Sequence, residues 1–360
     1  MMIDVKFSGI LRTETPFAVI PPNAVEISKP DGSRYRQIAR RSLYRDGLRV
    51  SRPVVPGSTL RGRLRRSAME VIFAITGQKW TLAEFHQNAI GGIKGAESEE
   101  AFDVVFRSTL REKNPILGLF GAGSPWMLSH VQMTDAIPLE DVETDVIGGV
   151  RTDDGRRDQG FFRKLQPEAA AEWRALVGGN AERTRIKAEV KRLRAELRNA
   201  RGSKDDPAAK AAETALRDLQ AAAVESEILA TNPVSLPLQH EAMPAGVEMS
   251  QDIDLMAVTD AEAGLFLLAL NHAWARRPNF GQHGSLGYGL ISAEYRVSIA
   301  DASSFDPFSI APRRQEVAVV RLQPQVGIVD PLPSELQACV DAFREQFSGY
   351  DFRVSGEIRT

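Results

Sequence analysis

The sequence predicts an α+β fold in which one sheet carries helices on one of its faces. Residues 2–12 alternate apolar and polar side chains in the manner of a strand. Residues 58–75 place their apolar side chains along one helical stripe, and strand-like and helix-like segments alternate from residue 245 onward. Such elements, interrupted by long inserts, are typical of an α+β sandwich.

The composition is that of a globular protein, and its arginines are unevenly distributed. The chain has 360 residues, of which 43% are hydrophobic and 26% charged, with a formal net charge of −2. Eleven arginines, no lysine and a single acid, Asp46, lie between Arg34 and Arg66. Planar guanidinium groups suit phosphate, so this cluster indicates nucleic-acid binding, although a solvated basic surface would have the same composition.

The sequence also limits the compartment and the covalent chemistry. The single cysteine, Cys339, excludes internal disulfides and cysteine-rich metal sites, and its apolar helical context predicts a buried thiol. The N-terminus lacks the pattern of a signal peptide, and the most apolar stretch, 263–275, is too short and interrupted to span a bilayer. We therefore expect a cytoplasmic protein without membrane contact.

The remaining segments are assigned from their local patterns. The basic, weakly patterned stretch 23–52 predicts an excursion loop or a small hairpin, and 116–121 predicts a tight turn that leads into a second core strand. Residues 139–165 contain a double glycine, a DDG turn and alternating flanks, which favours an extended hairpin that projects from the body. We expect one domain over 1–360, with a core at about 1–75, 116–138 and 240–300, a helical insert at 76–115, and a strand, helix and strand over 313–360.

Residues 181–229 predict a further insert, an antiparallel helical hairpin. Apolar residues recur at spacings of three and four, the "GSKDDP" segment breaks the pattern, and the pattern then resumes. The first arm is strongly basic. A solvated face and a nucleic-acid contact both remain open for it.

The first candidate site is the helix entrance "PGSTLRGRLRRSA", residues 56–68. Ser58 or Thr59 can cap the helix, and the free backbone N–H groups beside Arg61 would then form an anion site. Arg63, Arg65 and Arg66 lie at the edges of the apolar stripe or opposite to it. An ordinary capped helix would also account for this motif.

The second candidate site is the glycine-rich segment "FGQHGSLGYG", residues 280–289. Its glycines permit positive φ angles and a close approach of the backbone to a ligand. Hydrogen-bonding groups and a stacking face that suit a sugar-phosphate chain come from Gln282, His283, Ser285 and Tyr288. The segment is neither a Walker loop nor a dinucleotide-binding fingerprint. A simple glycine-rich turn before a strand is the competing interpretation.

Catalytic candidates are weak. The five histidines have no paired metal-ligand spacing, and His272 lies among aliphatic residues as a structural histidine would. Asp252 and Asp254 share one face of a predicted strand and could hold a divalent metal, but alternate acids are also typical of a solvent-facing strand surface. No nucleophile with a general base stands out. We expect no enzyme activity, no cofactor and no metal.

Taken in order, three segments resemble one family. They are "PVVPGSTLRGRLR", "AMPAGVEMSQDIDL" and "GQHGSLGYGLISAEY". The chain resembles the RAMP superfamily of CRISPR-associated proteins and, within it, the "Cas seven" group, whose members polymerise along a guide RNA. The resemblance implies a ferredoxin-like core of the RNA-recognition type, called the palm, with inserted fingers and a thumb hairpin.

The resemblance also implies roles for particular residues. The helix entrance and the glycine-rich loop would meet on the palm and hold the backbone of the guide RNA (crRNA). The implied RNA-binding residues are Ser58, Thr59, Arg61, Arg63, Arg65, Arg40, Arg41, Gln282, His283, Ser285 and Tyr288. Residues 139–165 correspond to the thumb, and the implied tip residues that push between nucleotides are Val146, Ile147, Val150 and Arg151.

Two departures from the family refine this expectation. RNA-cutting relatives carry an aspartate in the loop before the helix entrance, where this chain offers Ala39 or Arg40, with Asp46 nearby. We therefore expect no RNA-cleaving site. The helical hairpin at 181–229 is absent from ordinary members and favours a less common branch, such as the type IV systems.

The leading hypothesis is thus a non-catalytic crRNA-binding backbone subunit. Its copies would line the guide in a head-to-tail filament, bind other CRISPR effector subunits, and present the guide for pairing with target DNA or RNA. Two alternatives stay open. One is a metal-dependent endoribonuclease that uses Asp46 or the Asp252/Asp254 pair, and the other is a guide-processing nuclease that uses His283.

Overall fold

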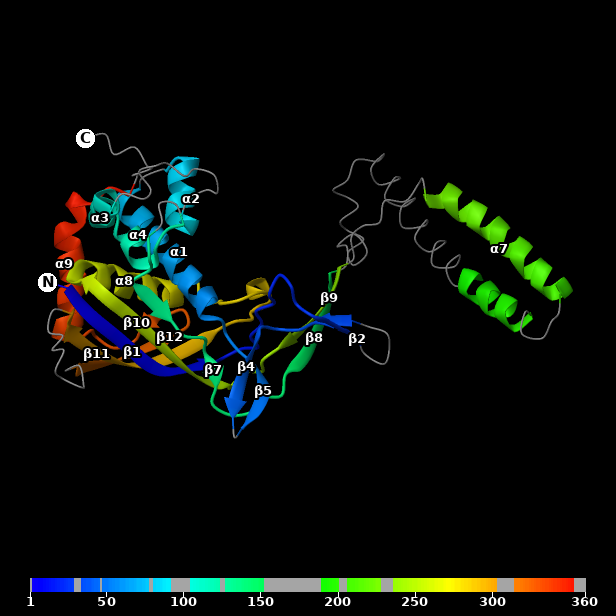
Figure 1. Cartoon of the computed structure of the whole chain (residues 1–360), viewed down its shortest axis with the longest axis horizontal. Helices are drawn as coiled ribbons and strands as arrows, with labels where there is room; N and C mark the ends of the chain where they lie inside the picture. Colours follow the sequence, from blue (N-terminus) through cyan, green and yellow to red (C-terminus); the bar gives the residue numbers. More distant parts are fainter. Residues whose placement is uncertain are drawn as a thin grey trace, which may run out of the picture. The chain divides into compact units, whose positions relative to one another are not determined.

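The structure is a computed structural model that describes most of the chain. The chain divides into two compact units. The described residues are 2–28, 34–45, 47–77, 80–91, 104–123, 127–151, 189–200, 206–227, 236–302 and 314–352. The first unit comprises 1–147 and 239–360, and the second comprises 148–238 (Figure 1). The second unit contains most of the segment that the sequence analysis assigned to a helical hairpin insert, and the expectation of one domain over 1–360 stays a prediction.

The first unit is built on an antiparallel sheet, and the α+β class is confirmed. The strand order is β13-β12-β11-β1-β10-β6, and β7 also pairs with β10. The strands are β1 (Met2–Thr13), β6 (Val131–Met133), β7 (Ile137–Pro138), β10 (Glu248–Thr259), β11 (Ile291–Asp301), β12 (Gln315–Gln323) and β13 (Gly327–Ile328). The central strand β1 pairs with β10 on one side and β11 on the other, so that Phe7 lies between Ile253 and Val297.

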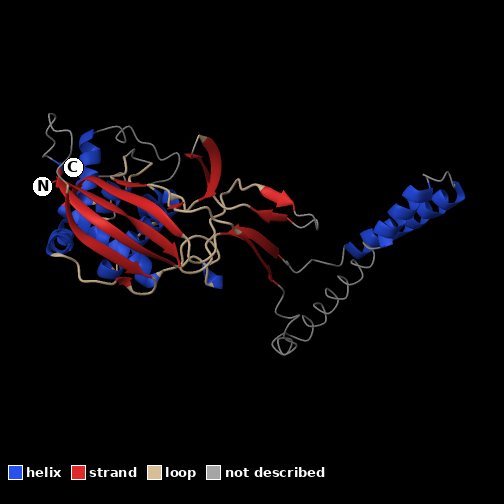
Figure 2. Cartoon of the chain, turned by 90° about the horizontal axis from the view of Figure 1, so that it is seen from below, coloured by secondary structure: helices blue, strands red, loops and turns tan. Residues whose placement is uncertain are grey.

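Helices cover one face of this sheet and enclose the core (Figure 2). They are α1 (Gly57–Thr76), α4 (Pro115–Phe120), α8 (Asp260–Arg276) and α9 (Ser334–Gln346). The buried side chains of β1 alternate along the strand as predicted, and the Phe7 ring contacts the rings of Phe266 in α8 and Tyr295 in β11, with centroids 5.5 and 6.1 Å away. These contacts fix α8 against the centre of the sheet.

The basic stretch before α1 forms short strands. β4 (Arg40–Arg45) and β5 (Leu48–Pro53) make a hairpin, in line with the predicted small hairpin. β2 (Glu26–Ser28) and β3 (Arg34–Arg36) join β9 (Leu236–Ala242) and β8 (Asp145–Arg151) in a second sheet of order β2-β3-β9-β8. Strand β9 thereby lies beside residues about 200 positions earlier in the sequence.

One of the predicted turns is wrong, and another lies outside the described residues. Residues 116–121 belong largely to α4, because Asn114 caps a helix that Pro115 starts. Residues 145–151, within the predicted hairpin, form a continuous strand through Gly148 and Gly149. Pairing with β9 satisfies the backbone of β8, and the β-branched residues next to the glycines favour an extended chain. The predicted DDG turn lies outside the described residues.

The predicted inserts are helical where the structure describes them. The 76–115 insert contains α2 (Leu82–Ile90) and α3 (Val104–Lys113). In the second unit, residues 189–200 and α7 (Asp206–Glu227) are helical, and Leu193, Ala200 and Ala212 are buried. The strand expected after α9 falls on residues outside the described ranges. Among the helices that the structure describes, none is long and apolar enough to cross a membrane.

Candidate nucleic-acid interface

The start of α1 already carries an anion, which comes from the protein itself. The helix begins at Gly57 after Pro56, and no side chain caps it, so the prediction that Ser58 is the cap is wrong. Instead, the Gly57 N–H donates to Oδ1 of Asp135 at 2.9 Å. A Cβ at position 57 would overlap the Met133 carbonyl oxygen, so glycine allows the segment that carries Asp135 to reach the helix end.

The predicted contact residues next to this cap differ in exposure. Ser58 is exposed, and Thr59 is half-buried with its N–H donating to the Pro56 carbonyl at 2.9 Å. Arg61 is exposed, and no ion pair engages it among the described residues. Arg61 is therefore the α1 side chain that is best placed to meet a phosphate.

Arg65 points into the protein, which corrects its assignment to the interface. It is 8% exposed, and its guanidinium donates to the carbonyls of Asn88, Gly121 and Gln87 at 2.5, 2.9 and 2.9 Å. Burial first, and the charge of Arg61 second, lower the pKa of Arg65 to about 10. Because its donors bind α2 and the end of α4, Arg65 holds helices together and does not line a surface.

Arg63 links the two candidate motifs. Its guanidinium donates to the Arg277 carbonyl and lies over the Phe280 ring, 5.7 Å from the centroid. Phe280 opens the glycine-rich segment, so this half-buried arginine fastens α1 to the loop that follows α8. Burial lowers the pKa of Arg63. The two motifs, more than 200 residues apart in sequence, are thus neighbours in the fold.

Arg40 and Arg41 are engaged by carboxylates. Arg40 forms an ion pair with Glu241, which is 4% exposed, and also donates to Oγ1 of Thr144 at 3.4 Å. Nε of Arg41 donates to Oδ2 of Asp135 at 2.5 Å, and about half of the Arg41 side chain is exposed. A nucleic-acid phosphate would therefore compete with protein carboxylates for these two arginines.

The glycine-rich loop has the backbone that the sequence predicted. Gly281, Gly287 and Gly289 have φ angles of 78°, 81° and 82°. A Cβ at Gly289 would overlap the Phe280 carbonyl oxygen, so only glycine fits there. Gln282 is exposed and fixes the loop to the 16–20 segment, since its N–H donates to the Ala18 carbonyl at 2.9 Å and its Nε2 to the Ile20 carbonyl at 3.2 Å. Ser285 lies in the 3₁₀ turn Gly284–Leu286, and its side chain is outside the described set.

His283 meets a histidine that the sequence did not single out. Its ring stacks on His240 of β9 with centroids 4.0 Å apart and planes 17° apart, and Tyr288 approaches both rings at 6.3 and 6.2 Å. Neither ring nitrogen of His240, nor Nε2 of His283, has a hydrogen-bond partner among the described residues. Burial, and second the charge of His283, lower the pKa of His240 to about 4. We name His240, His283 and Tyr288 the ring cluster.

The implied wedge residues lie in strand β8, which pairs with β9. Val146 and Ile147 belong to β8, and Ile147 packs against the core. Val150 and Arg151 are in the same strand, and their side chains are outside the described set. An exposed tip occurs on the β4–β5 hairpin, where Tyr44 is 81% and Leu48 69% exposed. The "YRDGLR" segment, with its DG turn, is a sequence signal that could have predicted this tip.

The candidate metal ligands on β10 are neutralised. Asp252 pairs with Nζ of Lys6 at 3.1 Å, and Asp254 pairs with Arg314 at 3.6 Å. Asp46 is outside the described residues. No group of three or more histidine, cysteine, aspartate or glutamate residues that could hold a metal occurs in the described part of the chain.

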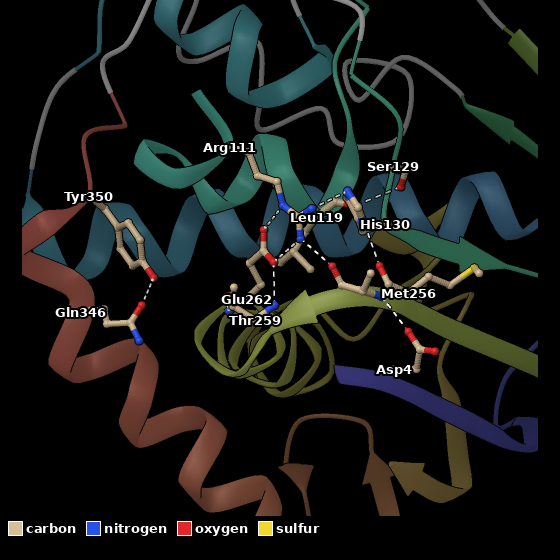
Figure 3. Close-up of polar contacts among 11 residues, drawn as sticks. Asp4, Arg111, Leu119, Ser129, His130, Met256, Thr259, Glu262, Gln346 and Tyr350 are labelled. Carbon is tan, nitrogen blue, oxygen red and sulfur yellow. Dashed lines mark hydrogen bonds and ion pairs between the residues drawn. The ribbon is translucent and has the colours of Figure 1, made fainter. Parts of the chain in front are cut away.

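A second buried polar cluster lies at the start of α8 (Figure 3). Arg111 of α3 donates to both carboxylate oxygens of Glu262, at 2.9 and 2.7 Å, and to the Ala257 carbonyl at 2.7 Å. Arg111 also lies 2.9 Å from Nε2 of His130, whose Nδ1 is 2.7 Å from the Met256 carbonyl oxygen. Glu262 completes a capping box with Thr259. We name Arg111, Glu262, His130 and Thr259 the arginine cluster; its contacts are structural.

Comparisons with known proteins gave no match by sequence and a likeness by structure. No protein-family model and no curated protein matches the chain. Among solved structures, a chain of a Type IV-B CRISPR Complex is similar over 87% of this chain and 95% of that chain, with a TM-score of 0.42 and 13% sequence identity.

Proposed function

We propose that this protein is a non-catalytic guide-RNA-binding subunit of a CRISPR ribonucleoprotein, in keeping with its sequence resemblance to the RAMP superfamily. One observation carries the proposal: Arg63 joins the helix entrance to the glycine-rich loop. Exposed Arg61 and Gln282 then lie on neighbouring elements, together with a backbone that glycines leave accessible. This combination suits a sugar-phosphate chain held without base readout.

The loop side of the first unit is favoured over the open face of the sheet. RNA-recognition folds that use the sheet face stack bases on exposed aromatic residues. The outward side chains of β1 and β10 include no aromatic residue. Outward charges are also paired, as in the Lys6–Asp252 contact at 3.1 Å and the Arg321–Glu294 contact at 2.9 Å. A phosphate would gain little on that face.

The β4–β5 tip takes over the wedge role in this proposal. Tyr44 offers an exposed ring, and Arg49 next to Leu48 is exposed as well. Aromatic rings stack on bases of any sequence, which suits a subunit that binds a guide of variable sequence. Copies arranged head to tail would place one such tip at each repeat of a filament.

Two observations support a non-catalytic role. Lys6 and Arg314 neutralise the aspartates that could hold a metal. His240 and His283 stack face to face, whereas a base and an acid that cleave RNA have to reach the 2′-hydroxyl and the leaving 5′-oxygen on opposite sides of the phosphorus atom. Incubation with guide, labelled complementary RNA and magnesium or manganese should leave that RNA intact. Metal-dependent cuts at regular spacing would contradict this part of the proposal.

The RNA-binding site is tested with one charge reversal and a matched control on the same helix. Arg61→Glu should release copurifying RNA. The plot of log affinity against log salt concentration should also become less steep, its negative slope shrinking in magnitude by about 1, because one phosphate contact is lost. Arg66→Glu is the control: Arg66 is exposed too, but it faces Glu70 at 3.4 Å. Equal RNA retention by Arg61→Glu and the wild-type protein would rule out this site.

A further inference from the structure

The ring cluster contains buried polar atoms that the protein does not satisfy. His240 is 4% exposed, and both of its ring nitrogens, together with Nε2 of His283, lack partners among the described residues. A buried polar atom without a hydrogen bond costs about 1–3 kcal/mol, so such groups are rare in folded proteins and need a reason. Three of them at one contact indicate a place where a ligand supplies the missing partners.

Backbone strain at the same place is a second, independent observation. His283 has a φ of 62°, a left-handed conformation that costs a residue with a Cβ about 1–2 kcal/mol. The hydrogen bond from Gln282 to Ala18, and the one from the Leu286 N–H to the His283 carbonyl at 2.8 Å, hold this conformation. Strain of this kind concentrates at ligand-binding sites. Here it keeps the His283 ring against His240.

The chemistry of the free atoms selects the kind of ligand. A neutral imidazole has one donor and one acceptor nitrogen, and burial keeps His240 neutral near pH 7. The oxygens of an RNA phosphodiester only accept hydrogen bonds, and arginine and lysine only donate them, so none of these groups can bond to both the donor and the acceptor nitrogens of the cluster. A ribose 2′-hydroxyl and the edge of a nucleobase each donate and accept.

The surroundings allow a nucleoside to approach. Gly281, Gln282, Leu286 and Gly287 around the cluster are exposed. No atom lies within 4 Å of the position of a Cβ on Gly287, so the space beside this glycine is open. Phe280, which carries the Arg63 guanidinium, precedes this loop directly and connects the cluster to the proposed backbone site.

We propose that His240 and His283 form a binding site for a neutral group of RNA that both donates and accepts a hydrogen bond, either a ribose 2′-hydroxyl or a nucleobase edge. This inference rests on the proposed RNA-binding function and adds a nucleoside contact to it. Phosphates then bind at Arg61 and the loop backbone, while the ring cluster recognises the nucleoside. Tyr288 offers a further ring for stacking.

The first test uses His240→Phe, which keeps a stacking ring of similar size and removes both nitrogens. RNA-stripped protein is titrated with RNA, with DNA and 2′-O-methyl RNA of the same sequence, and with homopolymers of uridine, cytidine and adenosine. We expect the wild-type protein to prefer RNA over the two 2′-modified chains, or one homopolymer over the others, by roughly tenfold. The first pattern identifies the 2′-hydroxyl as the ligand and the second the base edge. His240→Phe should lose the preference and keep the salt dependence.

The second test needs no variant. Ring-nitrogen resonances of His240 and His283 in the wild-type protein are followed by NMR while adenosine, cytidine or uridine is added. In a separate titration the phosphodiester dimethyl phosphate is added, which has no O–H donor. A nucleoside should shift these resonances and dimethyl phosphate should not. The inference is overturned if dimethyl phosphate alone shifts them, or if His240→Phe retains the wild-type preference. Failure of the wild-type protein to bind any oligonucleotide would instead overturn the proposed function, so the two failures are distinguishable.

Discussion

Two buried polar clusters, one at the start of α8 and one between β9 and the loop that follows α8, differ in how their polar atoms are paired. In the arginine cluster, Arg111 binds both oxygens of Glu262, and His130 has a contact at each ring nitrogen (Figure 3). In the ring cluster, His240 has none among the described residues. Burial without partners is costly, whereas burial with partners makes the structure more specific. The arginine cluster therefore pairs its charged groups within the protein, whereas the ring nitrogens of His240 are still able to form hydrogen bonds with a ligand.

The largest effect is expected from breaking the complete cluster. Glu262→Ala leaves the Arg111 charge without its carboxylate and removes the capping box of α8. The free energy of unfolding should fall by about 3–5 kcal/mol, the usual cost of breaking a buried ion pair. Urea unfolding followed by circular dichroism measures this change.

The matched control for that experiment is an exposed ion pair. Asp341 and Arg344 of α9 lie 3.1 Å apart, and both side chains are largely exposed. Asp341→Ala should change stability little, because water screens such pairs. If Glu262→Ala were as mild as Asp341→Ala, the arginine cluster would not be the structural centre described above.

A smaller loss of stability is expected at acidic pH, and His240 in the ring cluster should cause it. The folded pKa of His240 is about 4, below the ordinary 6.5, so between these values only the unfolded chain binds this proton. The contribution of His240 to the free energy of unfolding is therefore fully present above pH 6.5. It decreases as the pH falls toward 4, by up to about 3 kcal/mol. His283 and Tyr288 face His240 from the loop, and Arg36 lies beside it in β3.

The acid effect is assigned by comparing variants. Unfolding free energies at pH 7 and pH 4.5 should differ less in His240→Phe than in the wild-type protein, because the phenyl ring takes no proton in either state. An unchanged pH dependence in the variant would place the acid sensitivity elsewhere in the chain.

The features of the fold that depend on neighbouring residues in the chain could be predicted from the sequence. Alternation in β1, the helical stripe of α1 and the positive φ angles of Gly281, Gly287 and Gly289 all follow from nearby residues. The meeting of His240 with His283 does not, since β9 reaches the loop only through pairing with distant strands. No local pattern could have shown this contact.

The arginines of α1 show the same limit. Arg61 and Arg65 are one helical turn apart and have the same side chain, yet Arg61 is exposed and Arg65 is buried. The difference comes from the carbonyls of Gln87, Asn88 and Gly121, which bind Arg65 and belong to α2 and the end of α4. Tertiary neighbours, and not the helix itself, decide which arginine is available to a phosphate.

The smallest change in stability is expected from His240→Phe, and this variant distinguishes the ring cluster from the arginine cluster most clearly. His240→Phe removes ring nitrogens that bond to nothing in the described protein, so no partner is left unsatisfied and the stack on His283 persists. Stability at pH 7 should not fall and should rise by about 1 kcal/mol, since the apolar replacement removes the desolvation cost of unbonded polar atoms. Differential scanning calorimetry measures it. A loss comparable to that of Glu262→Ala would mean that His240 is as structural as the arginine cluster. A stable protein that has lost its preference among oligonucleotides would mean that these nitrogens are kept for binding and not for folding.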